Sequence, residues 1–425
     1  MSDTPENIVL ITVDSLRADY CGFLDGGEDL TPFLNDLASK SLVFEDAISP
    51  GPRTPSAMPS IVSGVHRAPP TQTRQDWGER WESIDAHLRT YGTVAEQLSR
   101  QGYDTVGITV NPWTVDLGFD RGFDQFYTLD DIVEESSLLT SPVWRLERFL
   151  REGKAGQYLD VVDKRQWFLQ WEDYYDKIAQ ALDDADRPYF IWVFLLDTHQ
   201  PYIVSNRFRE ENTSLEMFYA IVREFIARDQ SSLPDHVLYR LKGAYRDAVR
   251  SIDEFIRILS RDTILDDPVM VFHADHGEAF GEHGSFGHEP VLYRENIRVP
   301  LLVNGASVPR ERIREPVSLC VIPQIIEAIA SGKQLTRTSL VSEFVFSASE
   351  FGETACIYGN GWKLIRSGSD RELYDISRDP GEHADLSAER PVVVEGLETL
   401  LTQSQSRLHE RAAIRKAIDG MEAAL

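Results

Sequence analysis

Short, almost uninterrupted apolar runs alternate along this chain with longer segments in which apolar residues recur every three or four positions. Such runs are typical of strands buried on both faces, and the periodic segments are typical of helices that cover a sheet. We therefore expect an α/β fold with a mainly parallel sheet between helices. The predicted strands are residues 8–13, 105–110, 189–196, 269–273 and 299–303, with a further hydrophobic run at 42–48. The predicted helices are residues 31–40, 93–100, 215–227, 237–260 and 322–330.

The pattern changes beyond about residue 332, where strand-like segments become short and a long polar helix follows. We expect a large catalytic-type domain over residues 1–332, with a helical insertion at about 129–186, and a small α+β subdomain over residues 333–425. The subdomain is predicted to hold a small antiparallel sheet with strands at 340–346, 355–358 and 362–366, and a helix from about 391 to the end.

Composition adds information about habitat and partners. The 425 residues include 43 Lys+Arg against 69 Asp+Glu, which gives a net charge of −26, and only eight of the basic residues are lysines. Proteins that stay soluble in very high salt have this composition, so we expect a halophilic, haloarchaeal-type protein; an ordinary acidic cytosolic enzyme is the alternative. A nucleic-acid partner is not expected, because no basic stripe is available to displace counterions.

The cysteines and the apolar runs indicate the compartment. Cys21, Cys320 and Cys356 are too few and too scattered for a disulfide framework or a thiolate zinc site, and they suit a reducing interior. The N-terminus has no basic region of the kind that begins a signal peptide. The longest apolar run, residues 189–196, is far shorter than the ~20 residues that span a bilayer. We expect a cytoplasmic protein with no transmembrane segment, and the sequence does not indicate an oligomeric state.

Polar residues follow three of the predicted strands at the point where each strand ends. Asp14 follows the first strand, residues 197–202 follow the third, and residues 273–278 follow the fourth. Ligands collect at the carboxyl ends of parallel strands, and four of the ten histidines fall within residues 273–288. Because carboxylates together with a neutral imidazole suit a divalent cation, we expect a metal or phosphoryl-transfer site at this edge of the sheet.

Neighbouring polar residues have less specific interpretations. By spacing alone, Glu278, Glu282 and His283 compete for the same cation, although we expect both glutamates to be solvated loop or helix acids. Arg17 is expected to form a structural ion pair, and Asn111 to have a role in a turn after a strand.

A nucleophile is predicted in residues 51–64, which read as a turn entering a short helix. Thr54 or Ser56 would lie at the N-terminus of that helix, where backbone N–H groups and the helix dipole favour an anion. A bound cation would lower the pKa of such a hydroxyl. The spacing leaves open which of the two hydroxyls reacts, and an ordinary helix cap is the alternative for both.

Seven segments that follow one another in the chain resemble the sulfatase family of the alkaline phosphatase superfamily. The first of them, Asn7 to Tyr20, resembles the opening of the family and includes Asp14. The segment Ala274 to Gly284 contains the consecutive residues Asp275, His276 and Gly277. The segments are residues 7–20, 31–38, 119–124, 274–284, 292–303, 362–365 and 373–382.

The resemblance implies a fold and a set of site residues. The implied fold is alkaline phosphatase-like, with a large mixed sheet sandwiched by helices and a small C-terminal sheet subdomain. The implied ligands of one divalent metal ion, Ca²⁺ or Mg²⁺ with Mn²⁺ or Zn²⁺ as alternatives, are Asp14, Asp275 and His276. The implied substrate contacts are His199, which can hydrogen-bond the ester oxygens, and His288, which contacts the anion or protonates the leaving group.

This chain departs from the family at the nucleophile. Sulfatases oxidise a Cys or Ser to formylglycine, whereas this sequence has Thr54 at that position and its three cysteines elsewhere. We therefore expect no formylglycine. The second Asp that many members carry is replaced by Ser15. An unmodified hydroxyl suits phosphoryl transfer better than sulfuryl transfer, which favours a phosphoester substrate.

The sequence thus predicts a metal-dependent hydrolase of sulfate or phosphate esters, such as a phosphodiesterase, that acts on a small-molecule, glycan or lipid-headgroup ester. Thr54 would attack in line, Arg53 and the metal would stabilise the developing charge, and His199 or His288 would assist the leaving group. Two alternatives remain: a phospho- or phosphoglycerol-type group transferase, and a catalytically inactive, anion-binding pseudoenzyme.

Overall fold

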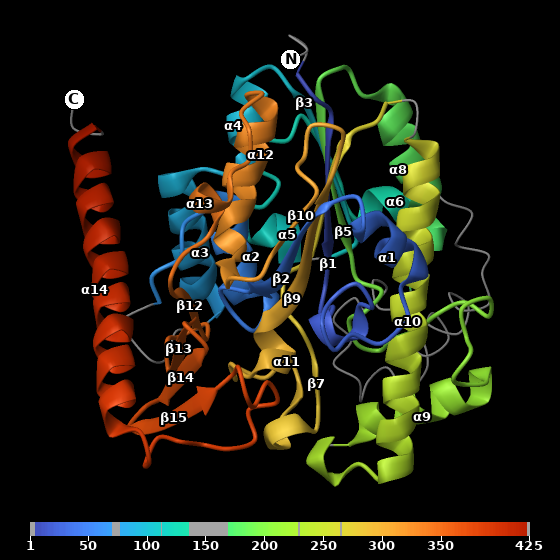
Figure 1. Ribbon diagram of the computed structural model, residues 1–425. Coiled ribbons are helices and arrows are strands. Elements are labelled where there is room, and N and C mark those ends of the chain that lie inside the picture. Colours follow the sequence, from blue (N-terminus) through green and yellow to red (C-terminus); the bar gives the residue numbers. More distant parts are fainter. Residues whose placement is uncertain are drawn as a thin grey trace.

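The computed structural model describes residues 5–69, 77–111, 113–135, 169–227, 230–263 and 266–422. Within them, a nine-stranded sheet has the order β10-β2-β9-β6-β1-β5-β3-β4, and β11 also pairs with β2 (Figure 1). Neighbouring strands are parallel except at β9, which is antiparallel to both β2 and β6. This confirms the mixed, mainly parallel sheet. The strands are β1 (Ile8–Val13), β2 (Leu42–Ile48), β3 (Asp104–Thr109), β4 (Gln125–Tyr127), β5 (Tyr189–Leu195), β6 (Val269–Ala274), β9 (Arg298–Asn304), β10 (Glu311–Ile313) and β11 (Val317–Ser318).

Helices cover both faces of this sheet (Figure 1). One layer contains α1 (Pro32–Ala38), α8 (Trp171–Asp184) and α10 (Asp235–Asp262). The other contains α2 (Thr54–Ser63), α3 (Trp77–Tyr91), α4 (Val94–Arg100) and α12 (Ile322–Ala330). Of these helices, the sequence predicted α1, α2, α4, α10 and α12 individually and α8 as part of the helical insertion at about 129–186. It missed α3, which gives only a weak periodic signal. The remaining helices are α5 (Trp113–Asp116), α6 (Leu129–Glu135), α9 (Ser214–Ile226), α11 (Arg294–Ile297), α13 (Arg337–Leu340) and α14 (Pro391–Glu422).

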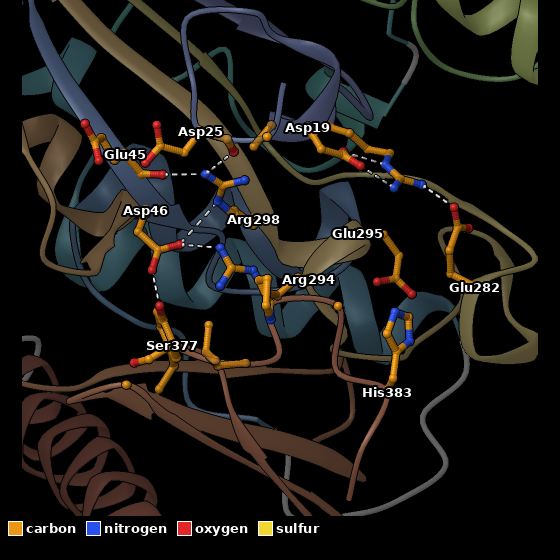
Figure 2. A pocket seen from close by; sticks show the side chains of 18 of the residues that line it. Asp19, Asp25, Glu45, Asp46, Glu282, Arg294, Glu295, Arg298, Ser377 and His383 are labelled. Atoms are coloured by element: carbon orange, nitrogen blue, oxygen red, sulfur yellow. Dashed lines mark hydrogen bonds and ion pairs between the residues drawn. The ribbon is translucent and has the colours of Figure 1, made fainter. Parts of the chain in front are cut away.

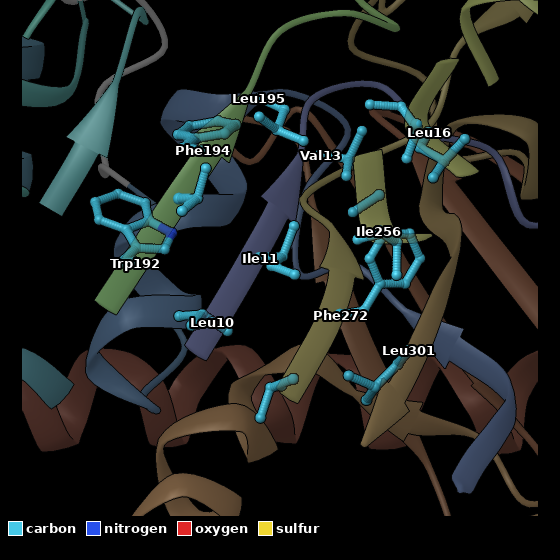
Figure 3. Close-up of a cluster of buried hydrophobic side chains, with 14 of the residues drawn as sticks. Leu10, Ile11, Val13, Leu16, Trp192, Phe194, Leu195, Ile256, Phe272 and Leu301 are labelled. Carbon is cyan, nitrogen blue, oxygen red and sulfur yellow. The ribbon is translucent and has the colours of Figure 1, made fainter. Parts of the chain in front are cut away.

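The central strands are buried on both faces because a helix layer lies on each side. All residues of β1, β5 and β6 are buried, which is why their sequences read as continuous apolar runs. Side chains from β1, β5, β6, β9 and α10 meet in one cluster that includes Ile11, Trp192, Phe272, Leu301 and Ile256 (Figure 3). This core holds the carboxyl ends of β1, β5 and β6 in fixed register.

A second, antiparallel sheet follows in the order β12-β13-β14-β15, and α14 packs against it. The predicted strand at 340–346 is wrong at its start, because Leu340 ends the short helix α13 and pairing with β13 begins only at Val345. A hydrogen bond of 3.0 Å from the Ala348 amide to the Pro50 carbonyl joins this sheet to the turn before α2. The strands are β12 (Val345–Ala348), β13 (Thr354–Gly359), β14 (Trp362–Ser367) and β15 (Asp370–Asp375).

The predicted helical insertion lies only partly in the described residues. Its ends are α6 and α8, and residues 136–168 lie outside the described part of the chain. The domain boundary near residue 332 stays a prediction. None of the helices in the described ranges combines the length and the apolar character needed to cross a membrane.

Candidate metal centre and nucleophile

The site forms where three parallel strands end side by side. Val13, the last residue of β1, pairs with Leu195 of β5 on one side and with Ala274 of β6 on the other. Asp14 and Asp275 each follow directly, so the sheet register places their side chains at the same edge. The position predicted for the site from strand ends is therefore the position in which these residues meet.

Asp14, Asp275 and His276 offer ligand atoms that all lie within 4.8 Å of one another. The Nε2 atom of His276 lies 3.4 Å from Oδ1 of Asp14 and 3.6 Å from Oδ2 of Asp275. The Nδ1 atom of His276 lies 2.8 Å from the Gly277 carbonyl, which can only accept, so Nδ1 carries the proton. The lone pair of Nε2 then faces the two carboxylates, as a metal ligand requires.

The electrostatics of this group favour a bound cation. Burial, and then repulsion from Asp275, raises the pKa of Asp14 well above its ordinary value, and burial raises the pKa of Asp275 to about 7. In the described part of the chain, neither carboxylate forms an ion pair with Lys or Arg. Two buried carboxylates and one imidazole lone pair therefore lack a compensating positive charge. Their oxygen and nitrogen donors fit a divalent metal ion.

The hydroxyl of Thr54 reaches this group, and that of Ser56 does not. Thr54 is the first residue of α2, and its Oγ1 donates to Oδ2 of Asp275 at 2.8 Å and lies 3.3 Å from Nε2 of His276. Ser56 Oγ instead donates to the Arg53 carbonyl at 2.8 Å and accepts from the Arg53 amide at 3.2 Å. The geometry thus leaves Thr54 as the hydroxyl beside the predicted ligands and uses Ser56 to cap the helix.

Arg53 and His288 adjoin the same turn. Nε of Arg53 donates to the His288 carbonyl at 2.5 Å, which ties the residue before Thr54 to the loop that carries His288. The His288 ring lies 5.2 Å from the ring of His276 and 5.1 Å from the ring of His199, measured between centroids. Three of the histidines predicted to contact metal or substrate therefore form one cluster.

The remaining histidine of the β6 strand end belongs to the core. His273 is fully buried on β6, where Nε2 lies 2.9 Å from the Thr12 hydroxyl and Nδ1 lies 3.0 Å from the Ala274 carbonyl. His199 also directs Nδ1 at a carbonyl, that of Gln200 at 2.7 Å. Burial lowers the pKa of His199 to about 4, so its ring is neutral near pH 7 and its Nε2 is a hydrogen-bond acceptor.

Three further residues hold Asp14, and the sequence patterns gave little sign of them. The Ser15 hydroxyl donates to Oδ1 of Asp14 at 3.0 Å, and the Thr198 hydroxyl donates to the Asp14 carbonyl at 2.6 Å. Asn111 has the predicted turn role, since its Oδ1 accepts from the Trp113 amide at 3.0 Å. However, its Nδ2 also lies 3.3 Å from Oδ2 of Asp14, so Asn111 is part of the site as well. Only its position after a predicted strand could have indicated this.

Glu278 corrects an expectation. It is not a solvated acid: its side chain is fully buried, and hydrogen bonds from the Gly277 and Glu278 amides to the Asn296 and Glu295 carbonyls hold this loop against α11. Glu282 is half-buried and forms an ion pair with the buried Arg17 at 3.1 Å. Arg17 also pairs with Asp19 at 2.7 Å, which bears out the structural ion pair expected for this arginine.

A separate cavity of about 750 Å³ lies between β2, the start of β9 and the C-terminal sheet (Figure 2). Its charged groups are mostly paired with one another. Asp46 accepts from Arg294 at 3.1 Å and from the Tyr358 hydroxyl, and it lies 3.3 Å from Nε of Arg298. Arg17 also lines the cavity. The hydrogen bond from Tyr358 to Asp46 connects β13 of the C-terminal sheet to β2, and the ion pair between Arg17 and Glu282 connects the loops that follow β1 and β6.

Comparison with known proteins places this geometry in a family context. Residues 6–338 match the family model described as "Sulfatase". The choline-sulfatase of Rhizobium meliloti (strain 1021) is 23% identical over 446 residues, covering 92% of this chain and 84% of the relative. The arylsulfatase of Clostridium perfringens (strain 13 / Type A) is 22% identical, covering 89% of this chain and 90% of the relative. The crystal structure of the phosphonate monoester hydrolase of Agrobacterium radiobacter superposes with a TM-score of 0.66 at 15% identity, covering 95% of this chain and 96% of the other.

Proposed function

Given that the chain belongs to the sulfatase family and is a hydrolase of sulfuric or phosphoric esters, we propose that it cleaves phosphoric esters, with Thr54 as the nucleophile. The observation that carries this proposal is the 2.8 Å hydrogen bond from the Thr54 hydroxyl to Asp275, within the group of candidate metal ligands. We assign Asp14, Asp275 and His276 to one divalent cation.

The chemistry of threonine supports phosphorus over sulfur. Threonine cannot be oxidised to an aldehyde by the route that makes formylglycine. None of the three cysteines is at the position of Thr54: they lie after η1 (Ala18–Tyr20), in η7 (Leu319–Val321) and in β13. A phosphorylated threonine can be cleared by water at phosphorus, whereas an O-sulfated threonine lacks the easy collapse of a formylglycine hydrate. The similarity in fold to a phosphonate monoester hydrolase is consistent with this choice.

The reaction follows from the hydrogen bonds of the site. When bound, the divalent cation lowers the pKa of the Thr54 hydroxyl and polarises the ester. Asp275 accepts the hydroxyl proton, and the Thr54 oxygen forms a bond to phosphorus as the bond to the leaving oxygen breaks. The leaving oxygen takes a proton from His288. Water then attacks the phosphorus of phosphorylated Thr54 and gives a proton back to His288. The bond from phosphorus to the Thr54 oxygen breaks, and this oxygen takes its proton back from Asp275 as the product is released.

Arg53 and His199 have supporting roles in this proposal. The Arg53 side chain, held by the His288 carbonyl, adds positive charge next to Thr54 and stabilises the equatorial oxygens. His199 is neutral and presents Nε2 as an acceptor, so it suits a hydrogen bond from the substrate, and protonation of the leaving group falls to His288.

A panel of esters tests the proposal. The protein is stripped of metal, reloaded separately with Ca²⁺, Mg²⁺, Mn²⁺ or Zn²⁺, and assayed at low and high salt on phosphate monoesters, phosphodiesters, phosphonates and sulfate monoesters. We expect metal-dependent turnover of a phosphorus ester, with a phosphorylated Thr54 peptide after rapid quenching. Turnover of sulfate esters alone would refute the choice of phosphorus. Products that form only with an added alcohol would indicate a group transferase, and the absence of metal binding together with the absence of turnover would indicate a pseudoenzyme.

The proposal also covers the salt concentration at which the enzyme works and the class of its substrate. The net charge of −26 and the low lysine content support activity in high salt, which the same assay measures. A small-molecule, glycan or lipid-headgroup ester is the proposed substrate class. The cytoplasmic location stays a prediction.

A further inference from the structure

Glu278 is a buried carboxylate that the proposed reaction does not use. Its side chain has no exposed surface, and neither Oε1 nor Oε2 has a hydrogen-bond partner among the residues that the structure describes. A buried carboxylate without a partner is costly in free energy, so its position needs a physical reason. Glu278 belongs to the loop after β6, two residues beyond His276.

The group that Glu278 faces is His288. Oε1 of Glu278 lies 3.5 Å from Nδ1 of His288, and this Nδ1 is also buried and without a hydrogen-bond partner in the described ranges. Arg17 contacts the main chain of Glu278 and not its carboxylate: it donates to the Glu278 carbonyl at 2.9 Å, and its ion pairs are with Asp19 and Glu282. Among the residues that the structure describes, His288 is therefore the one side chain that can form an ion pair with the Glu278 carboxylate.

The two ring nitrogens of histidine lie on opposite sides of the imidazole. A carboxylate beside Nδ1 favours a proton on Nδ1 and restricts rotation of the ring, which directs Nε2 away from Glu278. The His288 ring adjoins both His276 and His199, so it lies in the histidine cluster of the site. The ring of His288 is 27% exposed as a side chain, which leaves it accessible to a substrate.

We propose that Glu278 is a positioning residue for His288: it holds the ring with Nδ1 toward the buried carboxylate and Nε2 toward the substrate. This inference rests on the proposed function for its catalytic consequence. It deepens that function by naming the class of substrate for which Glu278 matters. Esters with an alcohol leaving group need a proton from His288, whereas nitrophenolate leaves without one.

The first test is a double-mutant cycle with Glu278→Gln and His288→Asn, assayed on an alkyl ester and on the nitrophenyl ester of the same phosphorus acid. Glu278→Gln keeps the shape of the side chain, but its amide can either donate to or accept from Nδ1 of His288. The variant therefore no longer favours one orientation of the His288 ring. We expect it to lower kcat on the alkyl ester by about 10–100-fold and on the nitrophenyl ester by less than about threefold. In the His288→Asn background, Glu278→Gln should change kcat by less than about twofold, because Glu278 acts through His288.

Glu282→Gln is the matched control, since it removes a carboxylate from the same loop that pairs with Arg17 and Lys242. We expect it to affect the two esters equally. Two results would overturn the proposal and leave Glu278 a purely structural residue. One is an equal loss of kcat on both esters in Glu278→Gln, and the other is a kcat in the double mutant that falls by the product of the two single-mutant losses.

The second test does not depend on activity or on a folded variant of Glu278. In protein labelled with ¹⁵N-histidine, two-bond ¹H–¹⁵N spectra distinguish a protonated ring nitrogen from a bare one, and His288→Asn assigns the resonance. We expect Nδ1 of His288 to be protonated. A bare Nδ1 would overturn the inference even if the esterase activity is as proposed. A protonated Nδ1 in a protein that turns over no ester would uphold the positioning and refute the proposed function instead.

Discussion

Replacing Thr54 with valine tests the proposed nucleophile with little change in shape. The substitution removes one buried hydrogen bond, 2.8 Å long, between a hydroxyl with 6% exposure and the fully buried Asp275. Hydrogen bonds to charged groups contribute about 1.5–3 kcal/mol, so we expect a loss of that size in the free energy of unfolding, measured by urea titration. Loss of a nucleophile lowers kcat far more, here by at least about 1000-fold on the best phosphorus ester of the panel.

Two matched variants and one trapping experiment complete this test. Thr54→Ser keeps the hydroxyl and should retain activity within about 100-fold, together with a phosphorylated peptide after quenching. Ser56→Ala removes the helix cap, which should cost about 1 kcal/mol of stability and leave the chemistry intact. Thr54→Val with activity within tenfold of the wild type, or an inactive Ser56→Ala that still folds, would refute Thr54 as the nucleophile.

Three further predictions concern the metal, pH and stability. Asp14→Asn should lose bound divalent metal after dialysis, measured by elemental analysis, because one of two buried carboxylates is neutralised. The hydrogen bond with Glu295 raises the pKa of His283 to about 9, so its stabilising contribution is complete below about pH 6.5 and is lost as the pH rises through about 9. Urea titrations across that range should show this loss, and His283→Gln should flatten the slope. Lys363→Met leaves Glu382 buried without its partner at 2.6 Å and should cost about 3–5 kcal/mol in unfolding free energy.

Each of these has a result that contradicts it. Unchanged metal content in Asp14→Asn would place the cation elsewhere. An identical pH dependence in wild type and His283→Gln would remove that histidine as the cause. Lys40→Met is the control for Lys363→Met, since Lys40 pairs with Asp36 where both side chains are more than half exposed, and it should cost less than about 1 kcal/mol. Equal costs in the two variants would contradict the effect of burial.

The sequence alone determined the architecture and the place of the site. The strands could be predicted because helices on both faces of the sheet require uninterrupted apolar runs, and a run such as β5 is a local property of the sequence. The place of the site could be predicted because parallel strands that end in register bring the residues after them to one edge. The choice of Asp14, Asp275 and His276 as the ligands came from the resemblance to the sulfatase family.

The tertiary structure decided what depends on contacts between distant segments. Thr54 and Ser56 are equivalent in spacing, and only the orientation of α2 against the β6 loop gives one of them Asp275 and the other the Arg53 backbone. The local sequence predicts a surface acid at Glu278, whereas the tertiary structure buries its side chain and places it 3.5 Å from Nδ1 of His288. The start of β12 was mispredicted because β13 across the sheet, and not local propensity, sets where pairing begins. The hydrogen bond of Thr54 joins residues 221 positions apart, and the other contacts depend on how turns and neighbouring strands are placed in space, which a local pattern does not encode.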